Sequence, residues 1–477
     1  MEHSTDGCGC EPHSGRWGSQ TRATHCREGE AGHNELLEGN MGDTEKSPTI
    51  STRLQWIATQ SVRYPNKVIT SLAHLIDVDL LRAAYCLTRK DGAVGVDGVT
   101  AQEYAGHLEE NLVSLHARLR ALKYKAPPVK RGWIDKDDGS QRPLGIPAFE
   151  DKIVQRAVTM LLSAVYEQEF YDFSHGFRPG RSPHMALQAL REMCYKCRVN
   201  WIVDADVHGF FDNLDHGLLR EIIKRRVNDG GLLRLIGKWL KAGVLEGEQL
   251  YHPIKGTPQG GVISPMLANI FLHHVLDGWF VKEIKPRLKG RCFLIRFADD
   301  FVIGCELEED ARRLMAVLPK RFGRFKLAIH PQKSRLVEFR NPDRRQSARS
   351  ESGSFDFLGF THYWAKSRRG NWVIKRKTAR KRLRRVMKLL WRWCQYNRHE
   401  KITEQYQALC LKLRGHYQYF GIRCNMRMLE RVYQLVRRAW RRWLGRRHRS
   451  GHISAEKFQT TIEKTFPLPR PRIVHNF

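Results

Sequence analysis

The sequence predicts an α+β fold in which an antiparallel sheet precedes an all-helical, strongly basic segment. Three observations predict it. Residues 201–207 and 293–304 have the β-branched and aromatic content of strands, with aspartates near their ends. Apolar residues at helical spacing begin near Thr52 and return after Lys366. The chain has 477 residues and a formal net charge of +32, which allows several domains and favours polyanionic partners.

The first 50 residues are rich in Gly, Ser and Glu and contain few large apolar side chains. They hold 4 Lys and Arg against 9 Asp and Glu, a composition typical of disordered segments. We therefore expect residues 1–50 to form a disordered leader, with helices beginning after it.

Two acidic elements carry the candidate chemistry. Asp204 and Asp206 lie two residues apart on the strand Trp201–Val207, so their side chains share a face. Asp299 and Asp300 stand between two apolar strands, where a hairpin lifts both carboxylates out of the sheet. Hard carboxylate oxygens suit Mg²⁺, and carboxylates from both elements could share a pair of metals that serves phosphoryl transfer. The alternative is a solvated surface turn.

The segment from Lys366 to Ser450 contains 27 Lys and Arg against 3 Asp and Glu. Apolar residues recur in it at helical spacing, as at Leu383, Met387 and Leu390. This pattern predicts helices with one packed stripe and a basic remainder, and it favours a nucleic-acid groove over an unliganded basic face. At least half of the tryptophans that interleave with the arginines are expected to be core residues: Trp391, Trp393, Trp440 and Trp443.

No apolar stretch approaches the ~20 residues needed to span a bilayer, and the N-terminus lacks a signal-peptide pattern. The 11 cysteines are scattered through predicted core segments, which fits reduced cytosolic thiols better than a disulfide framework. Cys194 and Cys197 form a CxxC with no second pair at zinc spacing. These features predict a cytoplasmic protein with no membrane partner.

Eight motifs in consistent order resemble those of reverse transcriptases encoded by bacterial group II introns, the RT-maturases. The matching segments are Gly92–Val99, Gln141–Pro147, Ser174–Ser182, Asp204–Asp212, Gly256–Pro265, Arg296–Asp300, His330–Ser334 and Phe357–Phe360. One such motif would be a weak signal, whereas eight in order are specific. The residue before Ala298 is Phe, where Tyr is also common in the family.

The resemblance implies a right-hand polymerase. Fingers are expected over residues 51–199, a palm with the antiparallel sheet over 200–365, and an all-helical basic thumb, called domain X, over 366–450. Residues 451–477 would be a short basic DNA-binding tail. An endonuclease domain is not expected, because paired cysteines and a His-Asn-His pattern are missing from that tail.

The resemblance also assigns residues to the two-metal mechanism of an RNA-directed DNA polymerase, a nucleotidyltransferase. Two Mg²⁺ ions would be held by Asp206, Asp299, Asp300 and the backbone carbonyl of Val207, while Asp204 matches no catalytic position. The incoming nucleotide would be bound by Lys136, Arg142, Phe210 and Gln259. Phe210 would be the gate that excludes the 2′-hydroxyl, and Phe211 the core residue beside it. The alternatives are a core role for Phe210 and a simple tight turn at the Gly-rich segment 256–261.

Nucleic-acid contacts are implied at further positions. The primer grip would be Leu358, Gly359 and Phe360, unless this segment is a plain turn. RNA-binding positions would be Arg178 and Arg181, near His175, and Arg414 and Tyr417 in the segment Leu413–Gly421, which resembles the maturase segment of domain X.

The function that the resemblance implies is reverse transcription from an RNA template and DNA primer with dNTPs. The protein would also bind its group II intron RNA to assist splicing, and would support insertion of this mobile element into target DNA by target-primed reverse transcription. Two alternatives are a splicing-only RNA chaperone and a reverse transcriptase of another lineage, serving a retron, a diversity-generating element or a CRISPR module. Intact Asp206 and Asp299 argue against the first, and Leu413–Gly421 favours the intron lineage.

Overall fold

The computed structural model describes residues 49–135, 141–247, 249–251, 255–257, 260–342, 353–448 and 451–477. Of the predicted leader, only residues 49 and 50 are described, and Ile50 opens the first helix. Contacts group the chain from Pro48 to Phe477 in one unit. Helices and β-sheets are mixed along the chain, which confirms the α+β class.

Five helices build the first part of the core. They are α1 (Ile50–Arg63), α2 (Val78–Leu87), α3 (Ala101–Gly106), α4 (Leu108–Arg120) and α5 (Phe149–Tyr166). Thr49 and Asp77 cap the N-termini of α1 and α2, and Thr100 forms a capping box with Glu103 at α3. Helix α5 is buried on most of its surface, and α1 and α2 pack against it.

The first sheet has four strands in the order β2-β1-β4-β5. Strands β1 (Val129–Asp135) and β2 (Gln141–Ile146) are antiparallel, and β4 (Val244–Glu246) joins β1 in parallel before β5 (Gln249–Tyr251) returns along it. Strands of residues 244–251 thus complete a sheet that begins at residue 129, on the other side of residue 200, where the boundary between fingers and palm stays a prediction.

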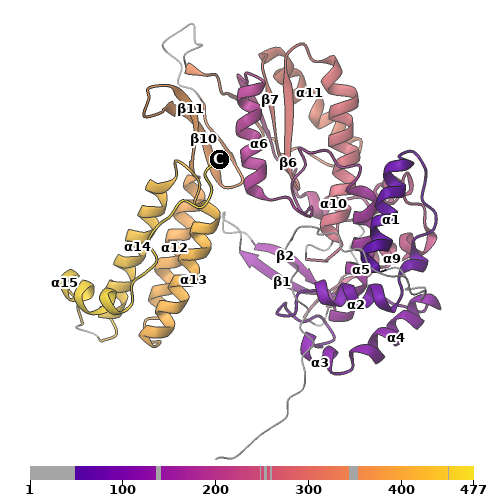
Figure 1. Ribbon diagram of the computed structural model, residues 1–477, viewed down its shortest axis with the longest axis horizontal. Helices are drawn as coiled ribbons and strands as arrows, with labels where there is room; N and C mark the ends of the chain where they lie inside the picture. Colours follow the sequence, from indigo (N-terminus) through magenta and orange to yellow (C-terminus); the bar gives the residue numbers. More distant parts are fainter. Residues whose placement is uncertain are drawn as a thin grey trace, which may run out of the picture. The chain divides into compact units, whose positions relative to one another are not determined.

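The second sheet is antiparallel, in the order β6-β7-β3-β8. Its strands are β3 (Trp201–Ala205), β6 (Cys292–Phe297), β7 (Asp300–Cys305) and β8 (Arg335–Glu338). Alternate side chains face opposite sides of a sheet. Val203 therefore packs into the core that contains helix α11 (Glu308–Gly323), whereas Ile202 packs with helix α6 (Pro183–Lys196). The two helices lie on opposite sides of the sheet (Figure 1).

Helices between β3 and β6 complete the main core. They are α7 (Phe210–Asn213), α8 (His216–Lys224), α9 (Gly230–Lys241) and α10 (Ser264–Leu272). After α10 the chain continues in π-helical turns over His273–Asp277 and Phe280–Ile284 and a short 3₁₀ turn over Lys285–Arg287. Eight of the nine residues of α10 are buried, so this helix lies at the centre of the core.

A third sheet of three antiparallel strands follows, in the order β11-β10-β9. Its strands are β9 (Phe355–Phe357), β10 (Phe360–Lys366) and β11 (Trp372–Thr378). The prediction of an all-helical segment from residue 366 is wrong over its first part. Residues 372–378 alternate between the two faces of a hairpin, and Gly370 supplies the positive φ that its turn requires.

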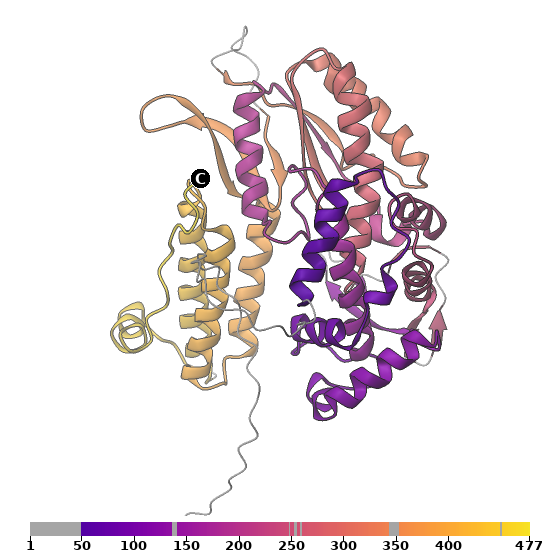
Figure 2. The same ribbon diagram turned by 45° about the vertical axis from the view of Figure 1, so that its right-hand side comes forward.

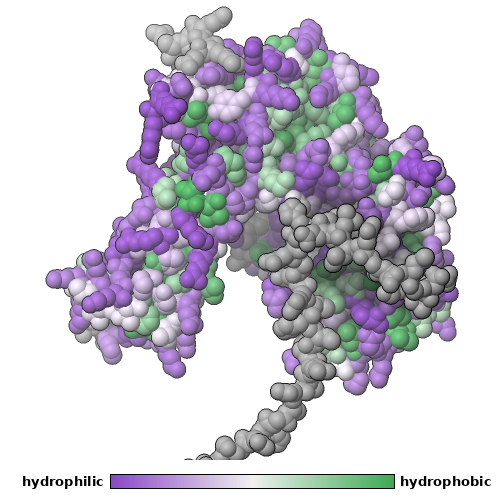
Figure 3. All heavy atoms as spheres, viewed as in Figure 1, coloured by the Kyte–Doolittle hydropathy of each residue, from purple (hydrophilic) through white to green (hydrophobic). Residues whose placement is uncertain are grey.

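Three long helices form the basic region: α12 (Arg380–Tyr396), α13 (Ile402–Phe420) and α14 (Met426–Gly445). They share a separate core that includes Leu409, Val432 and Trp440, and the chain after it packs back through Phe458 and Leu468. Helices α12 and α14 run side by side in both ribbon views (Figures 1 and 2). Hydrophilic side chains cover most of the visible surface over these helices (Figure 3). The predicted packed stripe and basic remainder are therefore confirmed.

The tail after α14 contains a short helix, α15 (Ala455–Lys457), and a π-helical turn over Phe458–Glu463. Its last residues return to α13, where His475 forms a bridge with Ile422. Within the described ranges, none of the helices combines the length and the apolar character that crossing a membrane requires.

Candidate catalytic site

The sheet topology brings the predicted acidic residues together at the same end of two central strands of the second sheet. Asp206 follows the last residue of β3, and Asp299 and Asp300 lie at the turn from β6 to β7. Strands β3 and β7 are neighbours, with Ala205 opposite Phe301. Residues 93 positions apart in the sequence therefore meet at the same end of two adjacent strands.

The turn that presents Asp299 is held from two sides. Phe297 pairs with Asp300, so Ala298 and Asp299 form the turn itself, and Ala298 has a φ of 57°. Behind it, a Cβ on Gly176 would lie 2.1 Å from the Ala298 nitrogen, so only glycine allows this approach. The buried Arg296 guanidinium donates to the Ala298 carbonyl at 3.0 Å and forms an ion pair with Asp277 at 2.6 Å.

Asp299 is partly buried beside other charges. Burial raises the pKa of its carboxyl group, and the nearby Asp206 raises it further. A hydrogen bond from its own backbone, Arg142 and Arg296 lower the pKa in part. Arg142 is exposed on β2, and its charge acts on the Asp299 carboxylate, while its role in nucleotide binding stays a prediction.

Asp300 stands among three other carboxylates. Its side chain reaches solvent, yet protein atoms surround it, as at the base of an open recess. This partial desolvation raises the pKa of Asp300 to about 7, and the charges of Asp204, Asp299 and Asp206 contribute to the rise. A hydrogen bond from the backbone of Leu358 lowers the pKa in part.

Cations partly neutralise the other two carboxylates. Lys333 lies 3.4 Å from Asp206, and Arg335 lies 3.2 Å from Asp204. Burial raises the pKa of Asp204, and the hydrogen bond from Arg335 lowers it. Asp204 thus has an ion-pair partner on the neighbouring strand, which agrees with its predicted structural role.

The donor set suits a hard cation, although a complete metal site is not preassembled. Among the described residues, no three His, Cys, Asp or Glu side chains are grouped as a metal would require. The carboxylates nevertheless raise one another's pKa, a repulsion that a divalent cation relieves. The residues on either side of Val207 form backbone hydrogen bonds with residues 328 and 330, so Val207 and Ile329 face each other without a hydrogen bond. The Val207 carbonyl therefore points away from Ile329.

Two predicted nucleotide-binding residues, Lys136 and Gln259, lie outside the described residues. The Gly-rich segment beside Gln259 does provide the predicted close approach of backbones. Gly256 has a φ of +90°, and a Cβ there would lie 2.8 Å from the Asp212 carbonyl oxygen. The Thr257 N–H donates to the Phe211 carbonyl at 2.8 Å. The segment is therefore anchored on the turn that follows Asp206.

The burial of the two phenylalanines is the reverse of the predicted one. Phe210 is 2 % exposed and packs against Phe271 in the main core. Phe211 is only partly buried and is the residue in contact with Thr257. Phe211 has the accessible ring because the helical turn at 210–213 directs consecutive side chains to different sides.

The predicted primer grip is a tight hairpin. Leu358 and Gly359 form the two-residue turn between β9 and β10, with φ values of 50° and 80°, the backbone that such hairpin turns use. Phe360 is fully buried behind it. The Leu358 carbonyl accepts a hydrogen bond from the Tyr419 hydroxyl of α13 at 2.9 Å. The hairpin therefore connects the carboxylate cluster with the basic helices.

Burial argues against Arg178 as an RNA-binding residue. Arg178 is 8 % exposed, pairs with Glu167 at 2.9 Å and donates to the carbonyls of Tyr171 and Ser174. Arg181 is partly buried and pairs with Asp172 at 2.6 Å. His175 is buried as well, and burial with Arg181 and Arg178 lowers its pKa to about 4. The buried residues of this segment support the β6–β7 turn, whereas Phe177 is 55 % exposed.

The two positions in the maturase-like segment differ. Arg414 is exposed on α13 and is free to contact RNA. Tyr417 is 1 % exposed, and its hydroxyl donates to the Pro469 carbonyl at 3.2 Å. The RNA-binding prediction for Tyr417 is therefore corrected: the side chain holds the C-terminal tail against α13.

The sequence motifs did not identify three residues that position the site. Ser334 Oγ accepts from the Asp206 N–H at 3.1 Å, and Asn269 donates to the Gly176 carbonyl at 2.8 Å. Tyr419 bonds the primer-grip hairpin. Ser334 ends the motif His330–Ser334 and Tyr419 lies in the maturase-like segment Leu413–Gly421, but nothing local marks Asn269, because its partner is distant in the sequence.

The fold brings the carboxylates together at the ends of two adjacent strands, and the comparison with known proteins specifies the class of domain. Residues 134–362 match the family described as reverse transcriptase (RNA-dependent DNA polymerase). The chain therefore carries a reverse transcriptase domain. All three described carboxylate positions, Asp206, Asp299 and Asp300, lie within the matched range.

Particular relatives include proteins that are named as intron-encoded or intron proteins. The group II intron-encoded protein LtrA of Lactococcus lactis subsp. cremoris is 38% identical over 242 residues, which cover 50% of this chain and 40% of LtrA. Protein YkfC of Escherichia coli K12 is 36% identical over 231 residues, or 47% of this chain and 61% of YkfC. The putative COX1/OXI3 intron 1 protein of Saccharomyces cerevisiae is 30% identical over 264 residues, or 54% and 31% of the two chains. The chain thus spans less than two thirds of these relatives, and its domain is related to group II intron-encoded reverse transcriptases.

Proposed function

We propose that the protein is an RNA-directed DNA polymerase that also binds a group II intron RNA. The meeting of Asp206, Asp299 and Asp300 at one sheet edge is the observation that carries the polymerase assignment. The relationship to LtrA and the basic helices α12–α14 support the intron RNA as partner. Assistance of splicing and target-primed insertion into DNA belong to the same proposal.

Each part of the site would have a separate task. Asp206 and Asp299, with Asp300 and the Val207 carbonyl beside them, would hold two Mg²⁺ ions. Such ions activate the primer hydroxyl and stabilise the leaving oxygen when bound. Arg142, with Lys136, would bind the triphosphate through charge-assisted hydrogen bonds. The hairpin at Leu358–Phe360 would support the primer end, and Gln259 would lie near the nucleotide.

Burial moves the sugar-gate proposal by one residue. Phe210 is packed in the core, whereas Phe211 is partly exposed beside the Gly-rich segment. We therefore assign the exclusion of the 2′-hydroxyl to the Phe211 ring, with Phe210 packed beneath it. A rigid aromatic face rejects the larger sugar by a steric clash.

The decisive experiment is primer extension on an RNA template with dNTPs and Mg²⁺. We expect Asp299→Asn to abolish DNA synthesis, because the amide cannot supply the negative charge that a metal pair needs. Asp79→Asn is the matched control, since Asp79 pairs only at the surface with Arg82. Full activity of Asp299→Asn would overturn the polymerase assignment.

The same variant separates the two activities. Asp299→Asn should still bind the intron RNA and assist its splicing, because the basic helices keep their charge. Splicing of a reporter intron measures this directly. Parallel loss of synthesis and splicing, with the fold intact by circular dichroism, would contradict two separable functions.

A further inference from the structure

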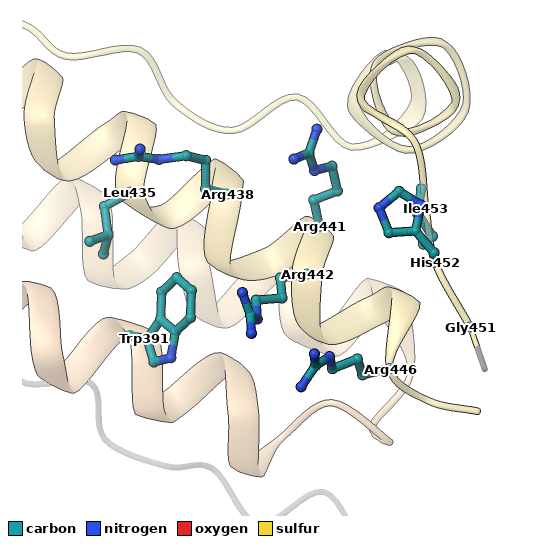
Figure 4. A pocket seen from close by; sticks show the side chains of 9 residues that line it. All are labelled: Trp391, Leu435, Arg438, Arg441, Arg442, Arg446, Gly451, His452 and Ile453. Carbon is teal, nitrogen blue, oxygen red and sulfur yellow. The ribbon is translucent and has the colours of Figure 1, made fainter. Parts of the chain in front are cut away.

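A recess lies on the seam between α12 and α14, in the basic helical region. Its volume is about 350 Å³, and it is lined by Trp391, Leu435, Arg438, Arg441, Arg442, Arg446, Gly451, His452 and Ile453. Figure 4 shows Arg442 of α14 pointing toward the Trp391 ring, with Arg446, which follows α14, farther along the recess. None of these residues belongs to the carboxylate cluster or to the primer-grip hairpin.

The recess concentrates positive charge that the fold does not neutralise. Four arginines line it and no acidic residue does. Within the described part of the chain, none of the four forms an ion pair, whereas neighbouring Arg437 pairs with Glu463. Like charges at such helical spacing repel. A polyanion would relieve this repulsion, because arginine forks match phosphate oxygens.

An aromatic ring is held at the same place. Trp391 is partly buried, and Trp443 meets it edge to face at a centroid distance of 6.2 Å. The Arg442 guanidinium lies 5.7 Å from the Trp391 ring centroid. A ring that is fixed from behind and flanked by guanidinium groups is a stacking platform for a base whose phosphates lie on the arginines.

The basic track is longer than this recess. A second hollow of about 730 Å³ lies on the same α12–α14 seam and shares Arg438 with the first. It adds Arg427 and Arg431 of α14, with one acidic residue, Glu430, between them, and the apolar Leu383 and Met387 of α12. Nineteen helical steps separate Arg427 from Arg446, which corresponds to about 28 Å along the helix axis. The ligand that fits is therefore a chain of phosphates and not a single nucleotide.

We propose that the seam between α12 and α14 binds a single-stranded nucleic acid, with one unpaired base stacked on Trp391 and the adjoining phosphates bound by Arg438, Arg442 and Arg446. A duplex would use the arginines but would leave the ring without a partner, because its bases are already stacked on one another. The site shares no residue with the polymerase centre, so this inference is independent of the polymerase assignment, while it rests on the proposed binding of nucleic acid by the basic helices.

Binding of a fluorescein-labelled ten-nucleotide single strand to the full chain tests the platform by anisotropy. We expect Trp391→Ala to weaken binding at least about fivefold, the effect of losing one stacked base, and Trp391→Phe to retain most of the affinity. Equal affinity of wild type and Trp391→Ala, or a preference for the matched duplex, would overturn the proposal. Comparison of an RNA strand with a DNA strand of the same sequence shows which nucleic acid the site prefers. Tighter binding of either one supports the proposal.

Salt dependence tests the phosphate contacts. Arg442→Gln with Arg446→Gln should reduce the slope of log K against log salt by about 1.4, or about 0.7 for each lost contact with a single strand. Arg392→Gln is the matched control, because Arg392 is exposed on α12 but does not line the recess. If Arg392→Gln reduced the slope by the same amount for each lost charge, the proposal of a defined site would be contradicted.

One crosslinking experiment can check both where the strand binds and whether its binding is independent of polymerase activity. A strand carrying 5-iodouridine should crosslink to the peptide that contains Trp391, and mass spectrometry identifies that peptide. Asp299→Asn should retain this crosslink even when it makes no DNA, so a failure of the polymerase assignment and a failure of this inference are distinguishable. Crosslinks confined to other peptides would overturn the proposal.

Discussion

At the scale of single residues, the carboxylates of the site differ in whether a cationic side chain pairs with them. Asp204 and Asp206 have cationic partners on the segment 333–335, whereas in the described part of the chain no ion pair reaches Asp299 or Asp300. The pKa values of Asp299 and Asp300 are raised, and that of Asp204 is raised as well despite its ion pair. Perturbed carboxylates gathered in this way mark functional sites, because a structural role alone would favour pairing.

The raised pKa of Asp300 predicts how stability depends on pH. The folded state binds this proton more tightly than the unfolded chain, since the pKa is about 7 in place of 3.8. In metal-free buffer the free energy of unfolding should therefore fall as pH rises from 3.8 to about 7. Solvent contact reduces the size of the effect.

Asp300→Asn should remove much of this decline. At pH values above the raised pKa of Asp300, the variant should therefore have a higher melting temperature than the wild type. Mg²⁺ should then stabilise the wild type more than the variant. Thermal melts over a pH series, with and without Mg²⁺, measure both effects. Parallel curves for the two proteins would contradict a titrating Asp300.

The two phenylalanines predict different phenotypes. Phe211→Ala should admit ribonucleotides, because the ring that excludes the 2′-hydroxyl is gone. Phe210→Ala should instead cost about 3–5 kcal/mol of folding stability, as expected for a buried ring. Primer extension with rNTPs or dNTPs and urea unfolding separate the two outcomes. If Phe211→Ala still excluded ribonucleotides, the assignment of sugar selection to Phe211 would be contradicted.

At the scale of elements, the site depends on the β6–β7 turn and on what lies behind it. Gly176 packs backbone to backbone against Ala298, and Arg296 holds the Ala298 carbonyl and Asp277. The template-like motif Ser174–Ser182 thus acts as a support for the catalytic turn. Breaking the buried Arg296–Asp277 pair by removing one partner should cost about 3–5 kcal/mol.

Gly176→Ala tests this support. The new Cβ would lie 2.1 Å from the Ala298 nitrogen, so the turn must move and Asp299 with it. We expect a loss of DNA synthesis together with reduced stability in urea. Gly237→Ala in α9 is the control, because nothing lies within 4 Å of its Cβ and alanine favours a helix by about 1 kcal/mol. Wild-type synthesis by Gly176→Ala would contradict the supporting role.

The maturase-like segment Leu413–Gly421 also acts as a connection between elements. Tyr419 bonds the primer-grip hairpin, Tyr417 bonds the tail, and Arg414 faces solvent. A motif that the sequence assigns to RNA binding is therefore largely a joint within the protein. The RNA-binding surface that we propose is therefore formed by exposed arginines of the three basic helices.

At the scale of the whole molecule, the excess charge dominates. The net charge is +32, and the segment 366–450 contributes 27 of the 82 Lys and Arg. Many surface ion pairs are present, but exposed pairs each contribute little to stability. The charge therefore reflects the polyanionic partner and not the requirements of folding.

This charge predicts a steep salt dependence of RNA binding by the intact chain. With six or more phosphate contacts, affinity should fall by about 10³-fold or more between 50 and 200 mM salt. Filter binding of a structured RNA over a salt series measures the slope, and circular dichroism confirms that the fold is unchanged. A slope near zero would show that contacts other than phosphates dominate.

The sequence by itself determined the α+β class, the acidic pair at a hairpin turn, the Gly-rich turn and the location of the basic helices. Alternation, turn residues and charge are local properties, so they can be recognised without a fold. Asp206, Asp299 and Arg142 were identified in this way. The β11 strand was missed because basic composition hid its alternation within a segment predicted to be helical.

Only the tertiary structure decided which of these side chains face outward. It buried Arg178, Tyr417 and Phe210, left Phe211 accessible, and joined strands 129–146 with strands 244–251 in one sheet. A motif specifies residue types at a spacing, but the direction of a side chain depends on partners that are distant in the chain. Burial and pairing are set by those non-local contacts, and for that reason the sequence alone could not assign them.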